Sequence, residues 1–152
     1  MSDAIKFRTI SNVDPEAVDW NEFQKYHAFF KERFPHIFET MKCEEVSLAS
    51  LLLTWEGEDP SLEPIALLGH QDVVPVTGAT ETDWTHPAFD GVDDGEFIWG
   101  RGALDMKNHL IGVLESCESL IAEGFKPVRT VYICLGHDEE VVAAPTSGAG
   151  AM

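Results

Sequence analysis

Hydrophobic side chains recur along the chain with two spacings, one typical of helices and one typical of buried strands. Between residues 21 and 34, aromatic side chains recur every three or four positions, which predicts an amphipathic helix that Pro35 ends. Upstream, the Asp-Pro-Glu sequence at 14–16 is typical of a helix start. A longer helix is predicted over 107–123, with Gly124 as its C-cap. Its predicted apolar face consists of Leu110, Val113, Leu114, Cys117, Leu120 and Ile121.

Short apolar runs predict the strands of a sheet. Strands are expected at 49–55, 64–69 and 129–135, with a small one at 96–99. The run at 64–69 is continuously apolar, which is typical of a strand covered on both faces. Residues 76–95 are rich in Gly, Thr, Asp and Pro and predict a long loop. The order strand, loop, strand, helix, strand predicts an α/β fold.

Composition and charge narrow the classes of partner. The chain has 152 residues, of which 44% are hydrophobic and 10% aromatic, as in a globular domain with a real core. The net charge is -17, from 27 acidic and 10 basic residues. Nucleic acids and anionic membrane surfaces both require a basic footprint, so neither is expected as a partner.

The chain is expected to divide into a folded domain and a tail. Residues 1–142 carry the predicted elements, whereas residues 143–152 are mostly small and predict a flexible tail. No apolar run approaches the roughly 20 residues that span a bilayer, and the N-terminus lacks the apolar core of a signal peptide. Three cysteines without metal-like spacing are expected to be reduced. Together these features predict a cytoplasmic protein.

Five polar residues stand at or near the ends of predicted strands. His70 and Asp72 follow one strand, Glu139 and Glu140 follow another, and Asp105 precedes the long helix. Imidazole and carboxylate groups from separate strands are a ligand set suited to zinc, with manganese or cobalt also possible. Asp72 could accept the second ring N–H of His70 and fix its tautomer. The alternative interpretation is a buried polar network that holds no metal.

These residues lie in three of four segments whose order resembles a known family. The segments are 69–75 (GHQDVVP), 84–89 (WTHPAF), 100–107 (GRGALDMK) and 136–140 (GHDEE). Together they resemble the aminoacylase and carboxypeptidase family of co-catalytic zinc peptidases and amidohydrolases. The FKP sequence at 125–127 is most similar to the carboxypeptidase S and Gly-Xaa carboxypeptidase branch. The resemblance extends to about residue 142 and covers only the N-terminal part of such enzymes.

The resemblance implies a role for each of the five polar residues. His70 would bind one zinc ion, Glu140 would bind a second, and Asp105 would bridge the two. Glu139 would act as general base, and Asp72 would orient His70. The chemistry is consistent, since zinc makes water easier to deprotonate and a nearby carboxylate can accept the proton.

The resemblance also implies a fold and an activity. The expected fold is a three-layer zinc-exopeptidase-like catalytic domain with a mostly parallel mixed sheet, here truncated, and with a cis peptide between Asp105 and Met106. The expected activity is hydrolysis of an amide bond next to a free carboxylate, in a dipeptide or N-acyl amino acid. No further acidic or histidine ligand can be matched after Glu140, so we expect an incomplete fragment with little activity alone. The alternative is an inactive metal-binding or interaction module derived from such an enzyme.

Overall fold

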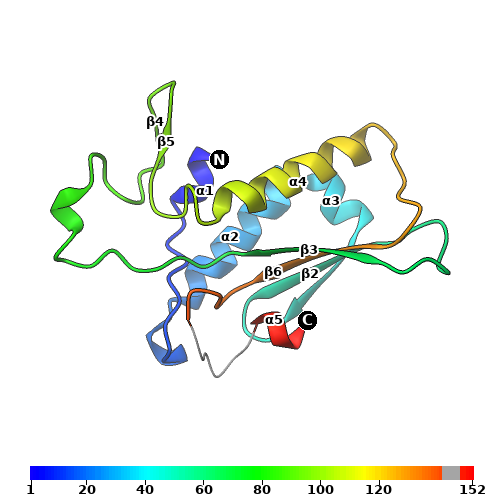
Figure 1. Cartoon of the computed structure of the whole chain (residues 1–152), viewed down its shortest axis with the longest axis horizontal. Coiled ribbons are helices and arrows are strands. Elements are labelled where there is room, and N and C mark those ends of the chain that lie inside the picture. The colour runs from blue at the N-terminus through cyan, green and yellow to red at the C-terminus, as the bar shows by residue number, and fades with distance from the viewer. Residues whose placement is uncertain (142–147) are drawn as a thin grey trace.

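The computed structural model describes residues 1–141 and 148–152 (Figure 1). It consists of a mixed four-stranded sheet with helices packed against it and a separate two-stranded sheet. The helical elements are α1 (Ser2–Ile5), η1 (Pro15–Ala17), α2 (Trp20–Arg33), α3 (Pro35–Thr40), η2 (Glu81–Asp83), α4 (Lys107–Ala122) and α5 (Gly148–Ala151). The strands are β1 (Lys42–Val46), β2 (Ser50–Trp55), β3 (Ile65–His70), β4 (Val92–Asp93), β5 (Ile98–Trp99) and β6 (Val131–Gly136). The predicted α/β class is confirmed.

The four-stranded sheet has the strand order β1-β2-β6-β3, and β4 and β5 form the two-stranded sheet. β1 pairs with β2 and β2 with β6 in antiparallel fashion, whereas β3 and β6 are parallel. The prediction of a mostly parallel sheet is therefore wrong for the described chain. The reason is the hairpin of β1 and β2, whose turn includes Ser47 at a φ of 59° and reverses the chain direction.

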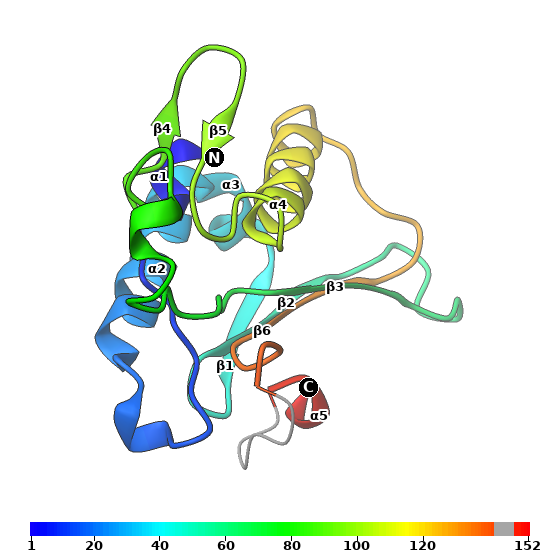
Figure 2. The same ribbon diagram turned by 60° about the vertical axis from the view of Figure 1, so that its left-hand side comes forward.

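The helices are distributed unequally over the two faces of the sheet. α2, α3 and α4 lie on one face, and α5 lies on the other (Figures 1 and 2). Within the described residues the second face carries only this short helix, so the expected three-layer arrangement is not seen there. Of the predicted tail, residues 143–147 lie outside the described residues, while Gly148–Ala151 is helical.

β3 is an edge strand, which corrects the prediction that it is covered on both faces. It pairs only with β6 among the described strands, and Ile65 and Leu68 are 44% and 66% exposed. A continuous apolar run indicates only that both faces are apolar, whereas cover depends on which elements pack there. The predicted strands at 49–55 and 129–135 correspond to β2 and β6, where leucine and isoleucine side chains are buried.

The long helix matches its prediction closely, whereas the first helix begins and ends differently. Asp14 caps only the 3-10 turn η1, and α2 begins after Asp19, whose carboxylate accepts from the Asn21 amide at 3.1 Å. Pro35 ends α2 as predicted but also starts α3, which the sequence pattern did not indicate. In α4, Leu110, Leu114 and Cys117 are buried as expected, while Leu120 is 38% exposed.

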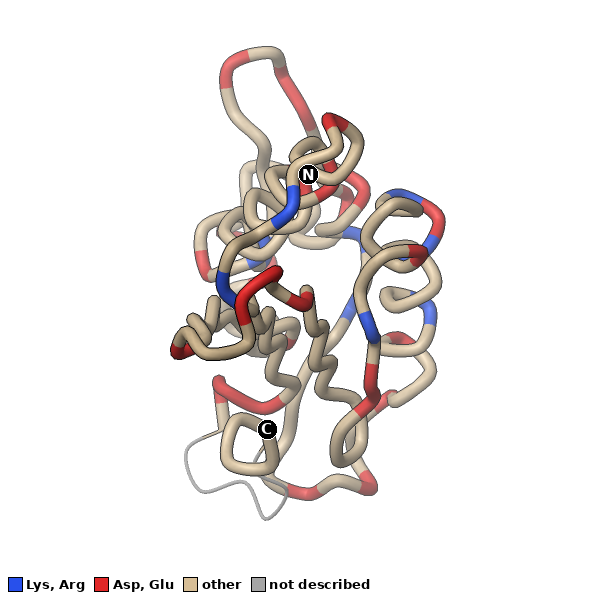
Figure 3. The backbone as a smooth tube through the Cα atoms, turned by 90° about the vertical axis from the view of Figure 1, so that its right-hand side faces the viewer, with Lys and Arg blue, Asp and Glu red and all other residues tan. Residues whose placement is uncertain are grey.

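The larger of two hydrophobic clusters among the described residues joins the helices to the sheet. It includes aromatic side chains of α2, aliphatic side chains of α4 and the inward faces of β2 and β6. Acidic positions are spread over loops and helix ends in all parts of the molecule, while basic ones are sparse (Figure 3). No helix among the described residues is long and apolar enough to cross a membrane.

Candidate metal centre

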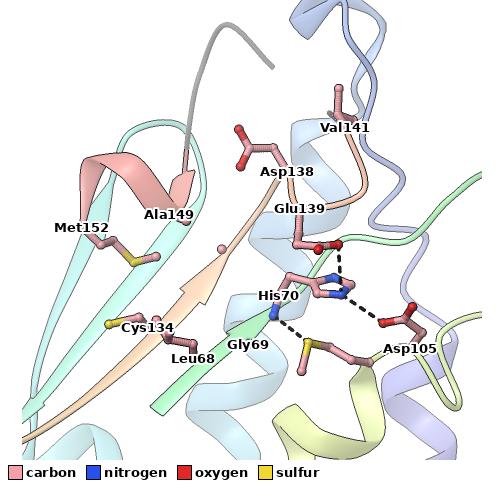
Figure 4. Close-up of a pocket in the computed structure, with 12 residues that line it drawn as sticks. Leu68, Gly69, His70, Asp105, Cys134, Asp138, Glu139, Val141, Ala149 and Met152 are labelled. Carbon is pink, nitrogen blue, oxygen red and sulfur yellow. Dashed lines mark hydrogen bonds and ion pairs between the residues drawn. The ribbon is translucent and has the colours of Figure 1, made fainter. Parts of the chain in front are cut away.

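The parallel pairing of β3 and β6 brings two of the sequence segments to one edge of the sheet. His70, the last residue of β3, is in register with Gly136, the last residue of β6. Parallel strands end on the same side, so the segment after β6 lies beside His70. Asp105 arrives from the turn before α4. These residues line a pocket of about 510 Å³ (Figure 4).

The ligand atoms lie at distances that suit a metal ion. His70 Nε2 is 3.2 Å from Asp105 Oδ1 and 3.6 Å from Glu139 Oε2. One ligand atom each from His70, Asp105 and Glu140 lies within 4.8 Å of the other two. Zinc binds nitrogen and oxygen ligands at about 2.0–2.2 Å, which separates two ligands by roughly 3–4 Å. Since the Asp105 side chain is 76% exposed and can rotate, the donor set fits a divalent cation.

Asp72 connects His70 to the turn that carries Glu139 and Glu140. Its carboxylate is fully buried, with Oδ1 3.3 Å from His70 Nδ1 and 3.2 Å from the Glu139 amide nitrogen. Its Oδ2 accepts from the Glu140 amide at 3.0 Å and from the Ser11 hydroxyl at 2.6 Å. His70 Nδ1 also lies 3.0 Å from the Asp72 carbonyl oxygen. Because both neighbours of Nδ1 are acceptors, this nitrogen carries a proton, and Nε2 is the ring nitrogen that lies beside Asp105.

Charges and burial shift the pKa values in the group. Burial lowers the pKa of His70, but hydrogen bonds and negative charge from Asp72 and Asp105 outweigh it and raise the pKa to about 9. Burial raises the pKa of Asp72, yet donation from His70, Ser11 and the Glu140 amide leaves it below its usual value. Burial and the neighbouring carboxylates raise the pKa of Glu140. The cluster therefore concentrates negative charge, which a bound cation would offset.

The turn before α4 is closely packed against the end of β3. The peptide between Asp105 and Met106 is cis, as the resemblance implied. Met106 Sδ accepts from the His70 amide at 3.4 Å. Gly102 has a φ of 81°, and a Cβ there would lie 2.8 Å from Val73 Cγ1. Only glycine permits both this conformation and this close approach.

Gln71 is a supporting residue that the sequence analysis did not single out, although it stands between His70 and Asp72. It is fully buried and donates to the Ala49 and Leu135 carbonyl oxygens, both at 2.9 Å. Its Oε1 lies 2.8 Å from His27 Nε2. His27 is 3% exposed, and this contact connects α2 to the segment that carries His70 and Asp72. No local pattern could have indicated this contact across 44 positions.

Lys107 is a second supporting residue that sequence reasoning missed. It is fully buried, and its Nζ donates to the carbonyl oxygens of Ala4 at 2.9 Å and Phe7 at 2.6 Å. The ammonium group also lies 4.7 Å from the centre of the Tyr26 ring. Burial lowers the pKa of Lys107 to about 7. These contacts fasten the N-terminal segment to the turn that carries Asp105.

His137, beside the glutamates, faces away from the cluster. Its ring is 1% exposed, its Nδ1 lies 2.7 Å from Ser50 Oγ, and it packs against the Trp20 ring. His86 packs edge-on against the Trp99 ring. Both histidine rings pack against tryptophan side chains.

A histidine and two carboxylates gathered beside the strand ends of an α/β fold define a candidate metal-binding domain. The chain belongs to peptidase family M20/M25/M40, whose family model matches residues 66–152. It is 43% identical to carboxypeptidase S of Saccharomyces cerevisiae, over 100% of this chain and 27% of that protein. It is 38% identical to the N-fatty-acyl-amino acid synthase/hydrolase PM20D1 of Bos taurus, over 91% of this chain and 27% of the relative.

Solved structures support the fold. Human carnosine dipeptidase 1 superposes with a TM-score of 0.74 at 16% identity, over 95% of this chain and 32% of that one. The M20 family metallo-carboxypeptidase Sso-CP2 from Sulfolobus solfataricus gives 0.70 at 17% identity, over 92% and 30%. The chain therefore spans about a quarter to a third of the length of the relatives that it matches. The predicted family, in its N-terminal part, is confirmed.

Proposed function

We propose that the chain carries part of the active site of a zinc-dependent hydrolase. The substrate class is a dipeptide or N-acyl amino acid, cleaved at the amide bond next to its free carboxylate. The names of two relatives support this class, since one is a carboxypeptidase and the other is an N-fatty-acyl-amino acid synthase/hydrolase. The observation that carries the proposal is the gathering of His70, Asp105 and Glu140 within 4.8 Å at the sheet edge.

Each residue then has a chemical task. His70 and Glu140 would each hold a zinc ion, with cobalt or manganese as substitutes, and Asp105 would contribute to holding both. When bound, zinc supplies Lewis acidity, which polarises a carbonyl oxygen and makes water easier to deprotonate. Glu139, whose side chain is 64% exposed, takes a proton from the attacking water and later gives it to the leaving nitrogen. Asp72 keeps His70 in the tautomer that presents Nε2 to the ion.

Zinc titration tests the ligand set. We expect the chain to bind zinc, and His70→Ala or Asp105→Ala to weaken binding at least about 100-fold, because each removes a direct ligand. Glu139→Gln should leave the affinity within about threefold, since Glu139 handles a proton and is not a ligand. Glu123→Gln, at the exposed end of α4, serves as the matched control. Isothermal titration calorimetry measures the zinc affinity of the wild-type chain and of all four variants. A wild-type chain that binds no zinc would contradict the proposal.

A second candidate function is an inactive metal-binding or interaction module. The number of ligands favours it, since each of two ions would have two protein ligands from the described residues, counting Asp105, against three in typical catalytic sites. We therefore expect negligible hydrolysis of dipeptides and N-acetyl amino acids by the zinc-loaded chain. Stoichiometric binding without turnover would support the module. Robust turnover that disappears in Glu139→Gln would instead support the enzyme and contradict this expectation.

A further inference from the structure

The N-terminal segment at 9–11 runs alongside the His70–Val73 segment. The Val73 amide donates to the Thr9 carbonyl oxygen at 3.0 Å, and Ile10 forms a parallel bridge with Val73. The Thr9 hydroxyl donates to the Gln71 carbonyl oxygen at 2.6 Å. This pairing places the next hydroxyl group along the segment, that of Ser11, against Asp72.

Ser11 completes the hydrogen bonding of a carboxylate that has no access to solvent. Asp72 is 0% exposed, and Ser11 is 7% exposed. Each oxygen of Asp72 has two donor neighbours among the described residues: His70 and the Glu139 amide at Oδ1, Ser11 and the Glu140 amide at Oδ2. A carboxylate offers about four acceptor positions, so the group is saturated in this orientation. The Ser11 bond, at 2.6 Å, is the shortest of these contacts.

We propose that Ser11 is a positioning residue of the metal centre, acting through Asp72 on both His70 and the Glu139–Glu140 turn. This inference rests on the proposed function, because it concerns the affinity of the same site for its metal. Rotation of the Asp72 carboxylate would move one of the two acceptors of His70 Nδ1 and the acceptors of two backbone amides together. The Ser11 hydroxyl opposes that rotation. It does so from a segment 61 positions away in sequence.

The simpler interpretation is that Ser11 is a buried hydroxyl that has found a partner and only adds stability. Thr9 offers a matched control for it. The Thr9 hydroxyl is also buried, also belongs to this segment and also donates at 2.6 Å, but its acceptor is the Gln71 backbone and not Asp72. Thr9→Val therefore removes a comparable bond between the same two segments and leaves the carboxylate untouched. If Ser11 has a purely structural role, Ser11→Ala and Thr9→Val should change the zinc affinity by the same amount.

The test measures zinc affinity of the 152-residue chain by competition with a chelator, well below the unfolding temperature of every variant. We expect Ser11→Ala to weaken binding about 10–100-fold, as loss of groups that orient metal ligands does. Ser11→Cys, which keeps the shape and donates weakly, should fall between Ser11→Ala and wild type. Thr9→Val should stay within about threefold of wild type. The visible absorption of bound cobalt, which reports ligand geometry, should change in Ser11→Ala and not in Thr9→Val.

Two results would overturn the inference alone: a Ser11→Ala affinity within about threefold of wild type, or a loss in Thr9→Val as large as that in Ser11→Ala. If Ser11→Ala does not fold, the comparison of Ser11→Cys with Thr9→Val decides by the same criterion. A wild-type chain that binds neither zinc nor cobalt would overturn the proposed function together with this inference. The two failures are therefore distinguishable.

Discussion

The side chains around the candidate metal centre differ sharply in their exposure. Asp72 and His70 are 0% and 5% exposed, whereas Asp105 and Glu139, which face the pocket, are 76% and 64% exposed. A buried, fully bonded carboxylate holds its orientation, since any rotation leaves hydrogen bonds unmade. The exposed carboxylates can adjust to an ion or a substrate. The candidate metal centre therefore combines a rigid buried pair, His70 and Asp72, with accessible carboxylates, Asp105 and Glu139.

The same buried support predicts how stability depends on pH. Burial lowers the pKa of His27, and the positive charge of Lys31 lowers it further. The hydrogen bond to Gln71 and the negative charge of Glu45, 4.0 Å away, raise this pKa, but by less than burial lowers it. The unfolded chain therefore takes up a proton near pH 6.5 that the folded chain resists. At this group the unfolded state binds more protons, so the contribution of His27 to the free energy of unfolding should fall as the pH drops from about 7 to about 5.

The His27→Gln variant isolates this contribution. Glutamine keeps a donor for Gln71 but does not titrate, so its free energy of unfolding should fall less than that of wild type over the same pH range. Urea unfolding at each pH provides the measurement. Identical pH dependence in the two proteins would show that His27 does not resist protonation in the folded chain.

At the scale of elements, α4 connects the core to the site. Its first residue follows the turn that carries Asp105, and its buried face packs on the sheet beside β3. Figure 2 shows the helix lying along the same face as α2 and α3. The core therefore holds Asp105 in place through the start of this helix.

Two leucines of α4 provide a test of that packing. Leu114 is fully buried, so Leu114→Ala should lower the free energy of unfolding by about 2–5 kcal/mol, because a cavity adds to the lost apolar transfer energy. Leu120 is 38% exposed, so Leu120→Ala is the same substitution at the surface. It should lower the free energy of unfolding by less than about 1 kcal/mol. Urea unfolding gives both values, provided the m-value is unchanged. Equal losses would contradict the burial of Leu114.

At the scale of the whole molecule, the net charge of -17 is the dominant electrostatic feature. Few ion pairs join distant elements of the described chain, and one that does is Arg33–Glu115 at 3.0 Å. Repulsion among unpaired carboxylates opposes the compact state, and salt screens it.

Stability should therefore increase with ionic strength. Raising sodium chloride from about 0.01 M to about 0.1 M shortens the Debye length from about 30 Å to about 10 Å. We expect the unfolding temperature to rise by about 3 °C, which corresponds to about 1 kcal/mol for a chain of this size. Differential scanning calorimetry in the absence of divalent cations measures this change. A fall in unfolding temperature would mean that ion pairs contribute more than repulsion removes.

Much of the fold and of the candidate site was predictable because it depends on local pattern. The long helix and the strands β2 and β6 follow from spacing and composition alone, whereas the predicted loop over 76–95 contains the 3-10 turn η2 and the short strand β4. The grouping of His70, Asp105 and Glu140 followed from their positions at element ends, and the family resemblance assigned each a role that stays a proposal.

The errors have a common physical cause. The β1–β2 hairpin, the exposure of β3 and the start of α3 at Pro35 depend on which elements pack together or on a single turn conformation. An apolar run has the same sequence in the centre of a sheet and at its edge. Burial of Ser11, His27 and Lys107 likewise follows from long-range packing that no spacing reveals.

By itself, the sequence determined the α/β class, the family and the five residues with ligand chemistry, since these depend on local periodicity and on motifs with fixed order. Only the tertiary structure decided how those residues are supported. Parallel pairing of β3 with β6 brought two segments to one edge, and the N-terminal segment then placed Ser11 against Asp72. A buried carboxylate must find its donors wherever the fold brings them, and that is a property of packing in three dimensions.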